Sequence, residues 1–142
     1  GATILLHFDA VFIAPNAKIK YPFSDLGLAP EVGSSFLLFQ SLGYQQAAQL
    51  LFESQPIDGN RYHELGLAKY VGEDFFDEAN KYAHMLKEQS LSSIIETKAI
   101  LKSFMQEDIA KSRSMETAAM KKLFGSEDNM KAVEKFFAKK NK

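Results

Sequence analysis

The chain has 142 residues, 46% of them hydrophobic and 12% aromatic, which suits one ordinary globular domain and excludes the polar, highly charged class of disordered chains. Seventeen basic and eighteen acidic residues leave a net charge of -1, so we expect no nucleic-acid partner and no attraction to an anionic membrane. The longest apolar runs, such as residues 10–14, fall far short of the roughly 20 residues of a membrane span, and the absence of cysteine excludes disulfides and thiolate metal sites.

The first third of the chain predicts a short helix, two strands and two further helices. An apolar pattern of helical spacing follows Gly1, and the compact apolar run over 10–14 is typical of a buried strand. Apolar residues alternate with lysines over 17–21, which predicts a second, half-buried strand. Helices are expected from Phe36 to Gly43 and over 44–53, and the glycine separates them.

The rest of the chain is mostly helical in pattern. A helical turn that ends at Gly66 and a short strand over 67–71 come first. Ser126 is the expected cap of the last helix, with the acids of "SED" in its first turn. Apolar residues at spacings of three and four predict helices over 75–88, 91–105, 107–124 and 129–140. We therefore expect an α/β (α+β) chain with a strand-and-helix part over 1–88 and a helical tail over 89–142.

Common catalytic and metal-binding motifs are missing from the sequence. There is no Gly-x-Ser-x-Gly elbow, Walker loop, GxGxxG or His-Glu-x-x-His pair. The three histidines, His7, His63 and His84, stand far apart, so each is predicted to be structural or solvent-facing. We expect no metal site.

One carboxylate in "SDLGLAPEVGSSF" has two interpretations. Pro30 and Glu31 stand just before an apolar helix, where proline suits the first helical position and an acid faces the positive end of the helix dipole. Glu31 could equally be a catalytic base placed at a loop. The local sequence leaves both interpretations open.

The basic end of the chain also has two interpretations. "MKAVEKFFAKKNK" contains five lysines and one glutamate, which is typical of a solvated face that favours the C-terminus of a helix. Lys139 and Lys140 also stand beside Phe136 and Phe137, so the same face would suit a ligand with an anionic and an aromatic part, such as a nucleotide.

Three separate stretches resemble the second half of the crotonase superfamily, the enoyl-CoA hydratase/isomerase family. They are "GATILLHFDAVFIAPNAKIKYPFSDLGLAPEVGSSF", "IDGNRYHELGLAKYV" and "SEDNMKAVEKFFAKK". The resemblance implies the last turns of a ββα spiral followed by a helical trimerisation tail, and a homo-oligomer that is a trimer or hexamer. Because the chain begins without methionine inside a helical pattern, we expect a portion of a longer protein whose N-terminal half is absent. Such a portion should be stable only with its other half or in an assembly.

The resemblance also implies a reaction. Family hydratases use two glutamates, and Thr3 and Phe23 stand in those positions here, so hydration is expected to be poor. Glu31 in "LAPEVGSS" matches the base of peroxisomal-type Δ3,Δ2-enoyl-CoA isomerases. One carboxylate can remove a proton from C2 and return it at C4, and apolar walls such as Phe23 and Phe36 would favour its protonated form.

The remaining parts of the implied site lie at the two ends of the chain. The enolate needs two backbone donors, and the resemblance assigns one of them to the residue preceding Gly1, with Gly1 nearby. Lys139 is the expected contact for the ribose phosphate of coenzyme A, which is part of the acyl-CoA substrate, so no separate cofactor is implied. Two alternatives stay open: a crotonase-fold hydratase or other acyl-CoA enzyme, and a non-catalytic acyl-CoA-binding or oligomerisation module.

Replacement of Lys139 tests the phosphate contact. Lys139→Ala should weaken the binding of coenzyme A more than that of dephospho-coenzyme A, because only the former carries the phosphate that the lysine is expected to meet. Calorimetric titration of the protein with each ligand measures the difference. Equal weakening of both ligands would contradict the assignment.

Overall fold

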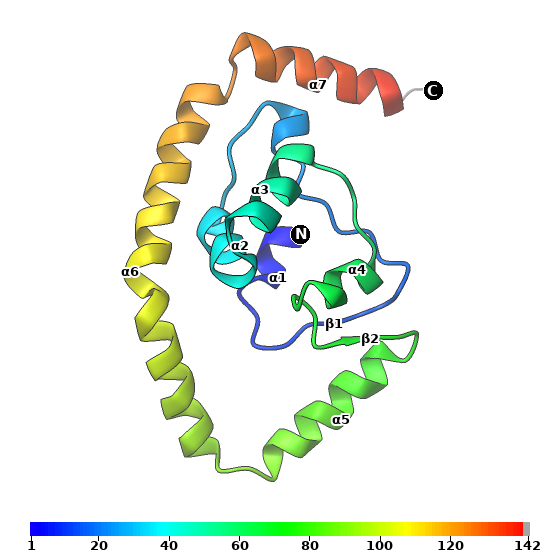
Figure 1. Cartoon of the computed structure of the whole chain (residues 1–142), viewed down its shortest axis with the longest axis vertical. Helices are drawn as coiled ribbons and strands as arrows, with labels where there is room; N and C mark the ends of the chain where they lie inside the picture. The colour runs from blue at the N-terminus through cyan, green and yellow to red at the C-terminus, as the bar shows by residue number, and fades with distance from the viewer. Residues whose placement is uncertain (141–142) are drawn as a thin grey trace.

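A small central unit is framed by three longer helices in the computed structural model, which describes residues 1–140 and the side chains of residues 1–138. The central elements are α1 (Ala2–Leu5), β1 (Phe12–Ile13), the 3-10 helix η1 (Ser24–Leu26), α2 (Ser34–Leu42), α3 (Tyr44–Glu53), α4 (Gly59–Glu64) and β2 (Tyr70–Val71). The frame consists of α5 (Phe75–Lys87), α6 (Leu91–Leu123) and α7 (Glu127–Lys140). Figure 1 shows α5 and α6 along the rim and the N-terminus near the middle of the view. In this frame α5 packs on β1, α6 on α2 and α7 on η1.

The sheet is smaller than the sequence pattern predicts. β1 and β2 pair in parallel, with Phe12 opposite Tyr70, so the strands expected over 10–14 and 67–71 form but shorten to two residues each. The strand predicted over 17–21 is wrong. Ile19 makes a single bridge to Ile57, with both N–H to O distances at 2.9 Å. Ile19 and Tyr21 are buried and Ala17 is partly buried, as the alternation predicts, but one bridging residue cannot build a ladder.

The tail contains one long helix where the sequence pattern predicts two. α6 runs unbroken for 33 residues, so the predicted boundary at Gln106 is wrong. Glutamine is a good helix former, and neither glycine nor proline occurs within α6. The Oγ of Ser90 caps its start by accepting a hydrogen bond from the Ser93 amide at 3.3 Å. At 1.5 Å per residue the helix extends about 50 Å, long enough to reach from α5 to α7.

The last helix is anchored by one buried asparagine. The Ser126 Oγ accepts from the Asn129 amide at 3.3 Å, which agrees with the predicted cap. The side chain of Asn129, only 4% exposed, donates to the Leu26 carbonyl at 2.6 Å and accepts from the Gly125 amide at 2.9 Å. Gly27 permits this contact, because its φ is +62° and a Cβ there would lie 3.0 Å from the Asn129 backbone.

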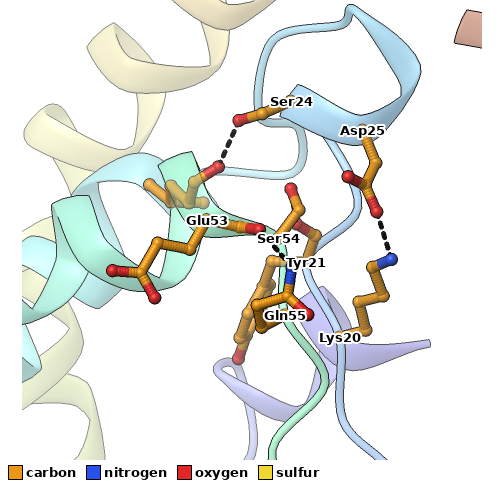
Figure 2. A network of polar contacts seen from close by, with 8 residues as sticks. Lys20, Tyr21, Ser24, Asp25, Glu53, Ser54 and Gln55 are labelled. Atoms are coloured by element: carbon orange, nitrogen blue, oxygen red, sulfur yellow. Dashed lines mark hydrogen bonds and ion pairs between the residues drawn. The ribbon is translucent and has the colours of Figure 1, made fainter.

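The segment that leads into the Glu31 loop is fixed to the end of α3 (Figure 2). The Ser24 hydroxyl donates to the Leu51 carbonyl at 2.5 Å, and the Ser54 hydroxyl donates to the Tyr21 carbonyl at 2.9 Å. An ion pair between Lys20 and Asp25 closes the same turn. These contacts hold η1 against the core.

Large apolar side chains along α6 are left exposed by the described chain. The most exposed are Leu91, Ile95, Ile100, Leu101, Phe104 and Met115. Neither α6 nor any other helix of residues 1–140 combines the length and the apolar character needed to cross a membrane.

Two tyrosines fill the centre of the core. Tyr21 and Tyr62 are 1% and 0% exposed and pack with Leu38 and Leu51. Burial raises the pKa of both phenols, and for Tyr21 the neighbouring Tyr62 adds to the effect. The folded state therefore retains these protons at a pH where the unfolded chain loses them.

This difference predicts a loss of stability in alkali. Below the unfolded pKa of about 10 both states keep the phenol protons, so the free energy of unfolding is unaffected. Above that pH the unfolded chain loses protons that the folded state keeps, and each buried tyrosine lowers the free energy of unfolding by up to about 1.4 kcal/mol per pH unit. Urea unfolding from pH 8 to 11 should show this decline, and Tyr62→Phe should make it shallower. Tyr44→Phe, at a tyrosine that is 66% exposed, is the control. A decline that is unchanged in Tyr62→Phe would contradict the account.

Candidate active site

The loop that carries Glu31 has an unusual backbone just before α2. Val32 has φ of +60° and Gly33 has φ of +75°, so two successive residues are left-handed. Glycine adopts this conformation freely, whereas a β-branched valine is strained by it. These residues delay the start of α2 to Ser34, and the prediction that Pro30 occupies its first helical position is wrong.

The N-terminus of α2 is held by a carboxylate from α6. Glu116, only 6% exposed, accepts hydrogen bonds from the Gly33 amide at 2.7 Å and the Ser35 amide at 3.0 Å. The hydroxyls of Ser35 and Ser112 donate to the same carboxylate at 2.6 and 3.2 Å. An anion at this position satisfies free N–H groups and faces the positive end of the helix dipole.

Glu116 therefore occupies the position that one interpretation of the sequence gave to Glu31. The Glu31 side chain is exposed, and its carboxylate makes no hydrogen bond or ion pair with the described residues. Only its backbone carbonyl takes part in the turn, by accepting from the Ser34 amide at 3.1 Å. The carboxylate of Glu31 is thus free to meet a ligand.

A histidine fixes the other side of the same loop. The Nε2 of His7, just after α1, donates to the Val32 carbonyl at 2.8 Å, so the ring must carry its proton on Nε2. The peptide between Val32 and Gly33 is therefore bound at both groups: His7 binds its carbonyl, and Glu116 binds its N–H. This double contact stabilises the left-handed backbone next to Glu31.

Glu31 lines a pocket of about 280 Å³ between its loop and α6. The loop contributes three residues and α6 the other five. The lining residues are Pro30, Glu31, Val32, Arg113, Glu116, Thr117, Met120 and Lys121. The free Glu31 carboxylate can accept a proton from a ligand in this pocket. The basic side chains of Arg113 and Lys121 can bind negative charge on the same ligand.

The other residues expected at the site do not gather around Glu31. Phe23 is 7% exposed and belongs to the core, and Phe36 lines a separate groove of about 480 Å³ between α2 and α6. Neither side chain lines the Glu31 pocket, so the expected apolar walls are elsewhere in this chain. Gly1 is the N-cap residue of α1. The side chain of Lys139 lies outside the described residues.

The sequence analysis did not predict Glu116 or its partners as part of the site. Their signal is weak but present, since Ile109, Ser112, Glu116 and Met120 follow helical spacing along α6. Two polar residues in such a stripe indicate a buried polar contact rather than plain core packing. The partner of that contact lies about eighty residues away in the chain, where no local pattern could reveal it.

The remaining histidines behave as expected from their spacing. His63 Nδ1 donates to the Ala68 carbonyl at 2.8 Å, and His84 is exposed on α5. Within residues 1–140 no group of three or more His, Asp or Glu side chains is arranged to hold a metal ion.

Comparison with known proteins places the chain in one family. Residues 1–142 match the family model described as enoyl-CoA hydratase/isomerase, so the chain belongs to the enoyl-CoA hydratase/isomerase family. A crystal structure of an enoyl-CoA hydratase/isomerase from Pseudoalteromonas atlantica superposes with a TM-score of 0.90 at 27% identity, covering 98% of this chain and 57% of that one. The architecture is accordingly the C-terminal part of the crotonase fold.

Individual relatives carry different activities in their names. The chain is 26% identical to a short-chain-enoyl-CoA hydratase of Clostridium acetobutylicum, over 99% of this chain and 54% of the relative. It is 25% identical to the peroxisomal enoyl-CoA delta isomerase 3 of Mus musculus, over 100% of this chain and 45% of the relative. The chain spans about half the length of the curated relatives it matches.

Proposed function

We propose that the protein containing this chain is an enoyl-CoA isomerase of fatty-acid β-oxidation that moves a 3-enoyl-CoA double bond to the 2-position, with Glu31 as the proton shuttle. The observation that carries the proposal is the division of roles between two glutamates. Glu116 binds the N-terminus of α2, whereas Glu31 stays exposed in a pocket with no partner among the described residues. Membership of the enoyl-CoA hydratase/isomerase family supplies the acyl-CoA substrate class.

The proposed reaction needs one base and no redox cofactor. The Glu31 carboxylate removes a proton from C2 of the 3-enoyl thioester, and the electron pair of the C–H bond forms a dienolate whose negative charge lies on the thioester oxygen. The protonated carboxyl then returns its proton at C4 while the double bond forms between C2 and C3. Atoms and electrons balance, because the same proton leaves and returns.

The start of α1 is the proposed place for the thioester oxygen. A backbone donor at the residue before Gly1 would stabilise the dienolate, and such a donor typically contributes a few kcal/mol. His7 follows α1 directly and donates to the Val32 carbonyl, so the chain connects this helix to the Glu31 loop by a hydrogen bond. Lys139 would contact the coenzyme A phosphate, and the exposed apolar side chains along α6 suit assembly into a trimer or hexamer.

A hydratase is the main alternative, because some relatives are hydratases. Water addition in this family uses two glutamates, and the second carboxylate lining the Glu31 pocket is Glu116. Both Glu116 oxygens already accept hydrogen bonds from Gly33, Ser35 and Ser112, so this carboxylate serves the start of α2, whereas Glu31 makes no such contact with the described residues. The arrangement favours chemistry that needs a single base.

Glu31→Gln tests the proposal in the intact protein. The amide keeps the shape of the side chain but cannot accept a proton, so kcat for trans-3-hexenoyl-CoA should fall by about 10²- to 10⁴-fold. Acyl-CoA affinity should stay within a few-fold, because the contacts of the ligand are unchanged. Steady-state kinetics that follow the 2-enoyl product measure both.

Glu73→Gln is the matched control, because Glu73 is exposed and lies outside the pocket. A Glu31→Gln variant that keeps most of the parent's activity would refute the assignment. Binding of coenzyme A thioesters without turnover of hexenoyl or longer 3-enoyl substrates would favour another acyl-CoA reaction or a binding role.

A further inference from the structure

α6 belongs to the tail that the family resemblance assigns to oligomerisation, yet it also contacts the loop of the candidate base. We propose that Glu116 is a positioning residue that fixes the Glu31 carboxylate by holding the Val32–Gly33 peptide from α6. This inference rests on the proposed role of Glu31. It adds a second function to the tail: besides assembly, the tail sets the geometry of the site.

Geometry makes Glu116 the main restraint on the loop. Its two oxygens bind the amides on either side of Ser34, at Gly33 and Ser35, so the carboxylate spans the junction between loop and helix. Gly33 lies directly against α6, because a Cβ there would come within 3.4 Å of the Ile109 side chain. Glu116 is only 6% exposed, which strengthens its hydrogen bonds relative to those of a solvated carboxylate.

The restraint matters because the neighbouring backbone does not prefer its observed conformation. Val32 is left-handed, with φ of +60°, and such a residue persists only where its surroundings enforce it. Among the residues with described side chains, His7 and Glu116 bind the Val32–Gly33 peptide unit. Loss of the hydrogen bond from the Gly33 N–H to Glu116 would let Val32 relax toward an ordinary conformation. This change would shift Glu31, the preceding residue in the chain.

The proposed reaction is sensitive to such a shift. A single carboxylate must reach both C2 and C4 of the same substrate, and a displacement of about 1 Å can cost as much as 10²-fold in rate. The loss should appear in kcat, because both Glu116 oxygens bind protein donors and the proposed role of Glu116 is to place Glu31 rather than to bind the substrate.

Two substitutions and a control test the role in the full-length protein. Glu116→Ala removes every contact, while Glu116→Gln keeps the volume and an acceptor for Ser35 but presents an amide N–H to the Gly33 N–H. Glu107→Ala is the matched control, since Glu107 is exposed on the same helix. Kinetics with trans-3-hexenoyl-CoA and amide hydrogen exchange over residues 32–36 are measured for each.

We expect Glu116→Ala to lower kcat by about 10- to 100-fold with KM changed less than about threefold. Exchange at Gly33 and Ser35 should speed up, Glu116→Gln should lose less kcat than Glu116→Ala, and Glu107→Ala should match the parent. If Glu116→Ala does not fold, Glu116→Gln decides the matter, because it preserves the packing volume.

Unchanged kcat in both Glu116 variants would overturn the proposal. A loss of kcat that a smaller folded fraction explains entirely would overturn it as well. Hydrogen exchange needs no substrate, so it decides whether Glu116 holds the loop even in a protein that lacks isomerase turnover. An inactive parent would refute the isomerase function itself. A parent that is active, with exchange unaltered in Glu116→Ala, would refute the positioning role alone.

Discussion

The buried carboxylate of Glu116 against the start of α2 is the contact on which the site depends. Hydrogen bonds to a charged group contribute about 1.5–3 kcal/mol each, and two backbone amides and two hydroxyls donate to this one. A left-handed valine costs about 1–3 kcal/mol, so the contact is large enough to maintain the strained loop. It also connects the tail to the core, because α6 packs on α2 at this place.

This contact gives the two glutamates of the pocket different chemistry. Both oxygens of Glu116 accept hydrogen bonds from protein donors, while the Glu31 carboxylate accepts none from the described residues. A single available base suits double-bond migration better than water addition, which is why the isomerase proposal follows from the hydrogen-bond pattern as well as from the family. His7 and Asn129 add to this arrangement. His7, which lies just after α1, fixes the loop, and Asn129 fixes α7 to η1 just before the loop.

Local patterns predicted most of the helices, and the resemblance of three stretches indicated the family, but less of the site was predicted. Glycine and apolar spacing defined α2 to α5 closely, because those signals act within a few residues. The strand over 17–21 failed because strand formation needs a partner, and among the described residues Ile57 alone pairs with this segment. Pro30 suggested an early helix start, which the positive φ of Val32 and Gly33 prevents. Glu116 was missed because its partners are distant in sequence, so a buried polar stripe was the only available sign.

The most direct test is the free energy of unfolding of Glu31→Gln and Glu116→Gln in the intact protein, measured by urea denaturation at neutral pH. The account predicts that Glu31→Gln changes it by less than about 0.5 kcal/mol, as at an exposed site, while Glu116→Gln lowers it by about 1–3 kcal/mol. A loss in Glu31→Gln equal to or larger than that in Glu116→Gln would contradict the account and return Glu31 to the role of a helix-start charge.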